Sequence, residues 1–107
     1  MTFDAYDRSL QLLRTLRPLL ENLAAIDPKL ADQMRRAAQS TTLNIAEANR
    51  RSGRDRRNRF RISLGSADEV AAALDVSMAL GYLDELATAP ALELVDRVRA
   101  MTYRLCH

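Results

Sequence analysis

The stretch LADQMRRAAQSTTLNIAEA, residues 30–48, decides the fold of this 107-residue chain. Its apolar and small residues recur every three or four positions, which places them on one face of an α-helix. These residues are Leu30, Met34, Ala37, Ala38, Thr41, Ile45 and Ala48. Asp27 and Pro28 precede the stretch as an N-cap residue and a proline at the first helical position. Ser52 and Gly53 mark the predicted end of this helix.

Helical spacing continues before this stretch. Apolar residues again recur every three or four positions along one face, and Pro18 is expected to bend this first helix. That face comprises Phe3, Tyr6, Leu10, Leu13, Leu16, Leu20 and Leu23.

Helical spacing also continues after the stretch. A third helix is predicted from Asp55 as N-cap to Gly81 as the residue that ends it. Its apolar face comprises Phe60, Leu64, Ala67, Ala71, Leu74 and Met78. Thr88, Ala89 and Pro90 are predicted to open a fourth helix with a face of Leu92, Val95, Val98, Met101 and Leu105. No useful length of sequence alternates with period two, so no strand is expected.

Helices of about 15 to 25 residues joined by short turns are typical of an all-α, antiparallel up-down-up-down four-helix bundle. Aromatic residues make up 5% of the chain and Trp is absent, so the core must come from aliphatic side chains, which favours helices. Residues 1–107 are expected to form a single four-helix bundle domain. A domain of this size buries only about two-thirds of the surface that its unfolded chain exposes, so contacts with partner subunits would add stability.

The sequence argues against catalysis and against a cofactor. Cys106 is the only cysteine and His107 the only histidine, so neither an internal disulfide nor a Cys/His metal cluster is expected. No Gly-rich phosphate loop or nucleophile motif is present. A small helical ribonuclease stays a third alternative, because Arg104 precedes His107 by three residues. The acidic residues 1–8 are unlike a signal peptide, so a cytoplasmic protein without a membrane span is expected.

Positive charge is concentrated in the middle of the chain. The net charge of the whole chain is +2, but nine arginines stand against Glu47 and Asp55 between Arg35 and Arg61. That segment carries +7, which leaves −5 for the rest, and such asymmetry favours an anionic partner. The arginines predicted to bind nucleic acid are Arg50, Arg51, Arg54, Arg56, Arg57, Arg59 and Arg61. Phe60 is the only aromatic residue among them, which favours phosphate contact with little sequence preference over base stacking.

A set of polar residues shares the faces of the second and third predicted helices. Its carboxylates could support acid–base chemistry, but a buried hydrogen-bond network is the preferred interpretation, with Arg35 or Arg36 neutralising a Glu. The set comprises Arg35, Arg36, Ser40, Asn44, Glu47, Ser66 and Glu69.

Gly65 lies in the predicted third helix at a cost of about 1 kcal/mol relative to Ala, which suggests close packing there. Small residues on these helices predict a ring-like homo-oligomer.

Several motifs together resemble one family in order and spacing. They are Arg35-Arg36-Ala37-Ala38-Gln39-Ser40, Asn44-Ile45-Ala46-Glu47, Phe60, Leu64-Gly65-Ser66 with Glu69, and Gly81-Tyr82-Leu83. The family is the four-helix bundle proteins encoded in intervening sequences of bacterial 23S ribosomal RNA genes. It includes the accessory variability protein of diversity-generating retroelements. The sequence departs from the common pattern at Ala48, where many members have Gly, and at residues 41–43, where many have a Pro-containing stretch.

The resemblance implies a homopentameric barrel with a basic surface, and for the retroelement protein it implies binding to nucleic acid and to a reverse transcriptase. The preferred hypothesis is therefore a non-enzymatic protein that binds RNA or DNA through its arginines, and an accessory role beside a reverse transcriptase is one extension of it. The main alternative is a protein–protein adaptor that uses the same surface without binding nucleic acid.

Overall fold

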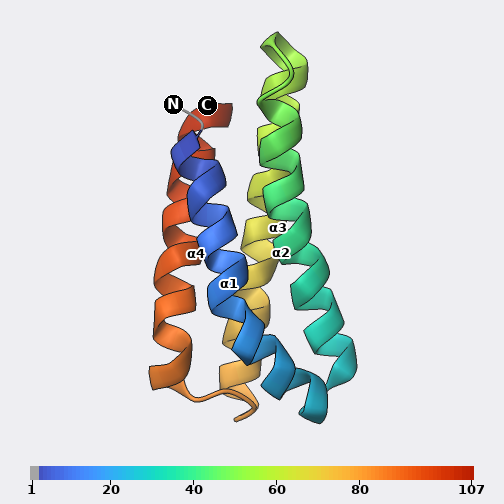
Figure 1. The fold of residues 1–107 in the computed structure, drawn as a ribbon, viewed down its shortest axis with the longest axis vertical. Coiled ribbons are helices and arrows are strands. Elements are labelled where there is room, and N and C mark those ends of the chain that lie inside the picture. Colours follow the sequence, from blue (N-terminus) through green and yellow to red (C-terminus); the bar gives the residue numbers. More distant parts are fainter. Residues whose placement is uncertain (1–2) are drawn as a thin grey trace.

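The structure, a computed structural model, describes residues 3–107, and these residues form four α-helices and no strand. The helices are α1 (Phe3–Ile26), α2 (Pro28–Ala48), α3 (Gly53–Ala79) and α4 (Glu85–Cys106). They pack into a bundle measuring 42 × 23 × 19 Å (Figure 1). α1 and α3 each pack against both α2 and α4. The prediction of an all-α bundle is confirmed.

The connection between α2 and α3 differs from the prediction. α2 starts as expected, because the Asp27 carboxylate accepts a hydrogen bond of 3.1 Å from the Leu30 N–H. It ends at Ala48, and Ser52 is the N-cap residue of α3, so the two residues predicted to end one helix instead begin the next. Gly53 has a φ of +59°, a left-handed conformation that lets the chain reverse sharply. Asp55, predicted as the N-cap, lies in the first turn of α3.

The connection between α3 and α4 confirms one prediction and corrects another. Gly81 has a φ of +74°, and the Tyr82 N–H donates to the Ser77 carbonyl over 2.8 Å, which completes a Schellman motif. α4, however, begins at Glu85 and not near Thr88. The Asp84 carboxylate caps α4 by accepting a 3.2 Å hydrogen bond from the Ala87 N–H, so the helix starts before Pro90, which lies inside it.

The core forms two clusters along the bundle. The larger cluster extends to the α3–α4 connection at Leu83 and is built from leucines of α1, mainly alanines of α2, and alanine, valine and leucine residues of α3 and α4. In α1 the buried leucines are Leu12, Leu16, Leu19 and Leu23. The buried face of α1 is therefore rotated relative to the predicted one, since Leu10, Leu13 and Leu20 are only half-buried. The Phe3 side chain lies outside what the structure describes. Pro18 lies inside α1, whose axis bends in its second half (Figure 1).

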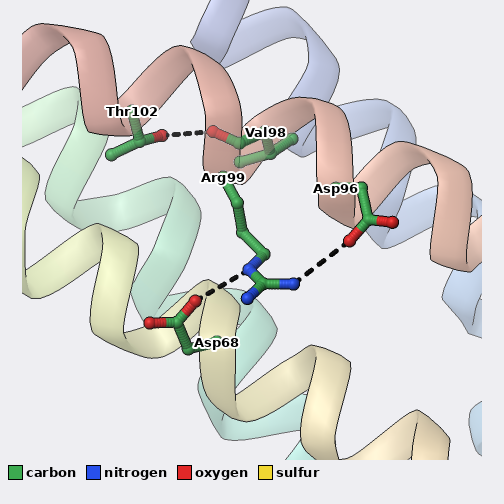
Figure 2. A network of polar contacts seen from close by, with 5 residues as sticks. All are labelled: Asp68, Asp96, Val98, Arg99 and Thr102. Atoms are coloured by element: carbon green, nitrogen blue, oxygen red, sulfur yellow. Dashed lines mark hydrogen bonds and ion pairs between the residues drawn. The ribbon is translucent and has the colours of Figure 1, made fainter.

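Arg99 of α4 ties this helix to α3. Its Nε donates to Asp68 Oδ1 of α3 over 2.7 Å, and its Nη1 donates to Asp96 of α4 over 3.1 Å (Figure 2). The hydrogen bond to Asp68 raises the pKa of the Arg99 guanidinium above its ordinary value. Because the three side chains are partly exposed, this contact aligns the helices more than it stabilises them.

The hairpin formed by α2 and α3 extends beyond the ends of α1 and α4, at the end of the bundle where the described chain also starts and finishes (Figure 1). Ala48 and Phe60 belong to the smaller core cluster, together with Ala5 and Cys106 from the ends of α1 and α4. None of residues 49–59 between them is buried. We call residues 49–61 the hairpin tip. Across residues 3–107, no helix is both long enough and apolar enough to span a membrane.

Candidate functional site

All seven arginines that the sequence predicted to bind nucleic acid lie on the hairpin tip. Five belong to the first three turns of α3, namely Arg54, Arg56, Arg57, Arg59 and Arg61. Arg50 and Arg51 lie in the turn and not on the end of α2, because α2 ends at Ala48. Three of the seven side chains contact other parts of the hairpin or are half-buried in it, and the other four are exposed.

Arg51 is held by two carboxylates across the turn. Its guanidinium lies 3.1 Å from Asp55 Oδ2 in α3 and 3.5 Å from Glu47 Oε1 in α2. A single arginine therefore bridges the end of one helix and the start of the next. This arrangement fixes the turn and neutralises much of the charge of Arg51.

Arg56 and Arg59 are half-buried against the hairpin itself. The Arg56 guanidinium lies 5.0 Å from the centre of the Phe60 ring, a cation–π contact, and its Nη1 donates to the Ala48 carbonyl over 3.3 Å. That carbonyl lies at the end of α2 and also accepts a 3.0 Å hydrogen bond from the Arg51 N–H. The Nε atom of Arg59 is buried, and no atom of residues 3–107 accepts a hydrogen bond from it. Both side chains thus belong to the packing of the tip.

The remaining four arginines, Arg50, Arg54, Arg57 and Arg61, are exposed, and no carboxylate of the described residues lies within 4.0 Å of them. We call them the outer arginines. Arg54, Arg57 and Arg61 fall at i, i+3 and i+7, so they share one face of α3. Arg54 and Arg61 line a shallow hollow of about 450 Å³ with Asp55 and Asn58. The Asp55 carboxylate there is engaged by Arg51.

The polar set predicted on α2 and α3 comes together only in part. Ser40 Oγ and Ser66 Oγ are 2.7 Å apart, and the Asn44 side-chain amide donates to the Ser40 carbonyl over 2.9 Å. Glu47 pairs with Arg51, as described above. Glu69 is exposed, and its carboxylate forms no hydrogen bond or ion pair with any residue in the range 3–107.

Arg35 and Arg36 do not neutralise a Glu, contrary to the prediction. Both pair with Asp32 on the same helix, and Arg36 Nε lies 2.9 Å from Asp32 Oδ2. The hydrogen bond from Arg35 lowers the pKa of the Asp32 carboxyl below its ordinary value of 3.8. The i, i+4 spacing of Asp32 and Arg36 is the signal that could have revealed this pairing in the sequence.

The outer surface of α2 and α3 exposes several apolar side chains. Leu43 is 65% exposed, Ile62 42% and Val76 44%. Gly65 is also exposed, and no described atom lies within 4 Å of the position that a Cβ there would take. The close packing predicted at Gly65 is therefore absent within one protomer.

The residues of the ribonuclease alternative do not form a pair. The His107 ring stacks on Tyr103 with centroids 4.0 Å apart, and its Nδ1 lies 3.0 Å from the Tyr103 carbonyl oxygen. Arg104 instead lines a small hollow with Asp4 and Met101. No group of three or more His, Cys, Asp or Glu residues within positions 3–107 could hold a metal ion.

Comparisons with known proteins agree with the fold. Residues 1–104 match the model of the family described as 23S rRNA-intervening sequence protein. The chain is similar to a crystal structure from Bacteroides thetaiotaomicron of a protein with unknown function from the S23 ribosomal protein family. The TM-score is 0.85 at 21% sequence identity, over 95% of this chain and 97% of that chain, so this likeness concerns the fold alone. No curated protein matches the sequence.

Proposed function

The chain belongs to the 23S rRNA-intervening sequence protein family, and on this premise we propose that it binds nucleic acid without catalysing a reaction. The observation that carries the proposal is the set of outer arginines on the hairpin tip. Four exposed guanidinium groups lie within one short segment, and no described carboxylate lies within 4.0 Å of them. Guanidinium groups bind phosphate oxygens in a bidentate way, so a phosphate backbone is a fitting ligand.

The arrangement supports binding with little sequence preference. Phosphate contacts position a protein on nucleic acid but carry no sequence information. The outer arginines belong to the hairpin tip, which extends beyond the ends of α1 and α4 (Figure 1), and charges of one sign gathered in one place attract a polyanion. A narrower form of the proposal is an accessory role, in which the chain presents RNA or DNA to a reverse transcriptase.

We further propose that the bundle, with its helices in antiparallel up-down-up-down order, assembles into a homo-oligomeric ring, a pentamer by resemblance. The exposed apolar side chains of Leu43, Ile62 and Val76 support this, because burial against a second copy would remove them from water. A ring would repeat the hairpin tip by symmetry and multiply its charge. Light scattering at micromolar concentration should therefore report an oligomer, and a monomer would contradict this part of the proposal.

The experiment that tests nucleic-acid binding is a salt titration with a labelled oligonucleotide. Counterion release makes log affinity fall linearly with log salt, with a slope of about −0.9 per phosphate on duplex DNA. Replacing Arg54, Arg57 and Arg61 with Gln should flatten that slope by up to about 2.7 and weaken binding to all sequences alike. A matched control replaces Arg14, Arg17 and Arg104, which are also exposed, and changes the net charge equally.

Two results would overturn the proposal. One is a parent protein that shows no binding even at low salt. The other is a triple variant that keeps both the affinity and the slope of the parent. In either case the protein–protein adaptor becomes the better hypothesis, because the charged surface would then have to serve a partner other than nucleic acid.

A further inference from the structure

The hairpin tip lacks the feature with which proteins hold single strands. Such sites combine a basic groove with exposed aromatic rings on which successive bases stack. Phe60 is the only aromatic residue of the tip, and it is 0% exposed beneath the Arg56 guanidinium. The tip therefore offers charge to a backbone but no ring to a base.

The aromatic residues of the other helices do not supply a platform on the tip. Tyr6 and Tyr82 are half-buried and pack against the two core clusters. Tyr103 is 53% exposed, but it lies on α4, and one face of its ring is stacked on His107. Tyr103 is thus the most exposed tyrosine of the described residues, and it provides a control for the inference.

The outer arginines are spaced closely enough along α3 to contact neighbouring phosphates of a rigid nucleic-acid duplex. At 1.5 Å per residue, Arg54 and Arg61 are separated by about 10.5 Å along α3, with Arg57 between them. Duplex DNA carries one phosphate per about 1.7 Å of its axis, so a length of about 10.5 Å holds about six phosphates, divided between its two strands. One strand alone, at about 3.4 Å per phosphate, presents about three over the same length. A flexible single strand must in addition lose conformational freedom to align with the helix.

From this geometry we infer that the hairpin tip selects double-stranded nucleic acid over single strands, through its phosphates and without stacking. The inference rests on the proposed function and specifies its ligand class. Each phosphate contact contributes about −0.9 to the salt slope on duplex DNA and about −0.7 on a single strand, so three contacts give about −2.7 and about −2.1. The preference for the duplex should therefore be about fourfold larger at 0.1 M salt than at 1 M.

The experiment compares a labelled 16-base-pair DNA duplex with each of its separated strands, chosen so that neither strand folds on itself. The expected result is tighter binding of the duplex, with a steeper salt slope that makes this preference about fourfold larger at 0.1 M salt than at 1 M. The variant that replaces Arg54, Arg57 and Arg61 should lose most of this preference. Tyr103→Ala should change neither the affinity for the duplex nor the affinity for the single strands.

The possible outcomes separate the inference from the function on which it rests. Equal or tighter binding of the single strands overturns the duplex inference but leaves phosphate binding by the tip intact. Loss of single-strand binding in Tyr103→Ala would also overturn it, because a base would then stack on α4. Absence of binding to both ligands overturns the proposed function itself. A duplex preference that survives the triple variant contradicts the assignment to the tip.

Discussion

Replacing Arg56 with Met tests the division of the tip arginines into structural and outer groups. Met keeps an unbranched apolar side chain over the Phe60 ring but removes the charge that lies 5.0 Å from its centre. It also removes the 3.3 Å hydrogen bond to the Ala48 carbonyl, which leaves the end of α2 without that donor. The variant should therefore be less stable, while its surface charge toward a ligand changes little.

The expected magnitude follows from these two contacts. A partly exposed cation–π contact contributes about 0.5–1 kcal/mol, and a hydrogen bond about 0.5–1.5 kcal/mol. Together they predict a loss of about 1–2.5 kcal/mol in the free energy of unfolding. For a chain of this size, 1 kcal/mol corresponds to about 4–8 °C, so Tm should fall by roughly 4–20 °C.

The assay pairs thermal unfolding, followed by helical circular dichroism, with the salt titration of a labelled duplex. Arg56→Met should melt earlier and keep the salt slope of the parent. Arg57→Met, the matched variant in the outer group, should keep the parent Tm and flatten the slope by about 0.9. If Arg56→Met melts like the parent and instead flattens the slope, Arg56 contacts the ligand and the division is wrong.

Two further predictions concern the folded protomer. Gly81→Ala should lower the free energy of unfolding by about 1 kcal/mol, because Ala is strained at a φ of +74° although its Cβ would meet no described atom within 4 Å. Urea unfolding measures this, and a variant as stable as the parent would refute it. Asp32→Asn should be slightly less stable than the parent at neutral pH, because Arg35 and Arg36 stabilise the charged carboxylate of Asp32 in the folded protein and lower its pKa. This stabilising effect is present above pH 3.8, and it is lost as the pH falls through the pKa of Asp32 in the folded state. Urea titrations along a pH series should show the difference between the two proteins shrinking in acid, and a constant difference would contradict the assignment.

Helix content was predictable because its signals are local. The apolar period of residues 30–48, the Asp27-Pro28 start and the Gly81 end each depend on contacts within about one helical turn. The boundary between α2 and α3 was not predictable in the same way. A Ser-Gly pair is compatible with both the end of one helix and the start of the next, and the choice depends on where the chain must reverse.

The roles of the tip arginines could be predicted only in outline. Their clustering is visible in the sequence, but which guanidinium turns inward depends on how α2 and α3 pack. Arg56 reaches Ala48, eight residues away, only because the hairpin brings the two together. Glu69 was expected in a buried network, yet it lies on the outer surface, because Ser40 finds its partner across the hairpin at Ser66.

The projection of the hairpin beyond the rest of the bundle makes its reach adjustable during evolution. Apart from the half-buried Arg56 and Arg59, residues 49–59 are exposed, so most of their sequence can drift without loss of core contacts. Seven residues added to each arm would return every side chain to nearly the same face and lengthen the hairpin by about 10.5 Å. Doubling the length of the connecting turn would cost only about 0.6 kcal/mol. Relatives built on this bundle can therefore differ in the ligands that their hairpin tips contact while they keep the same fold.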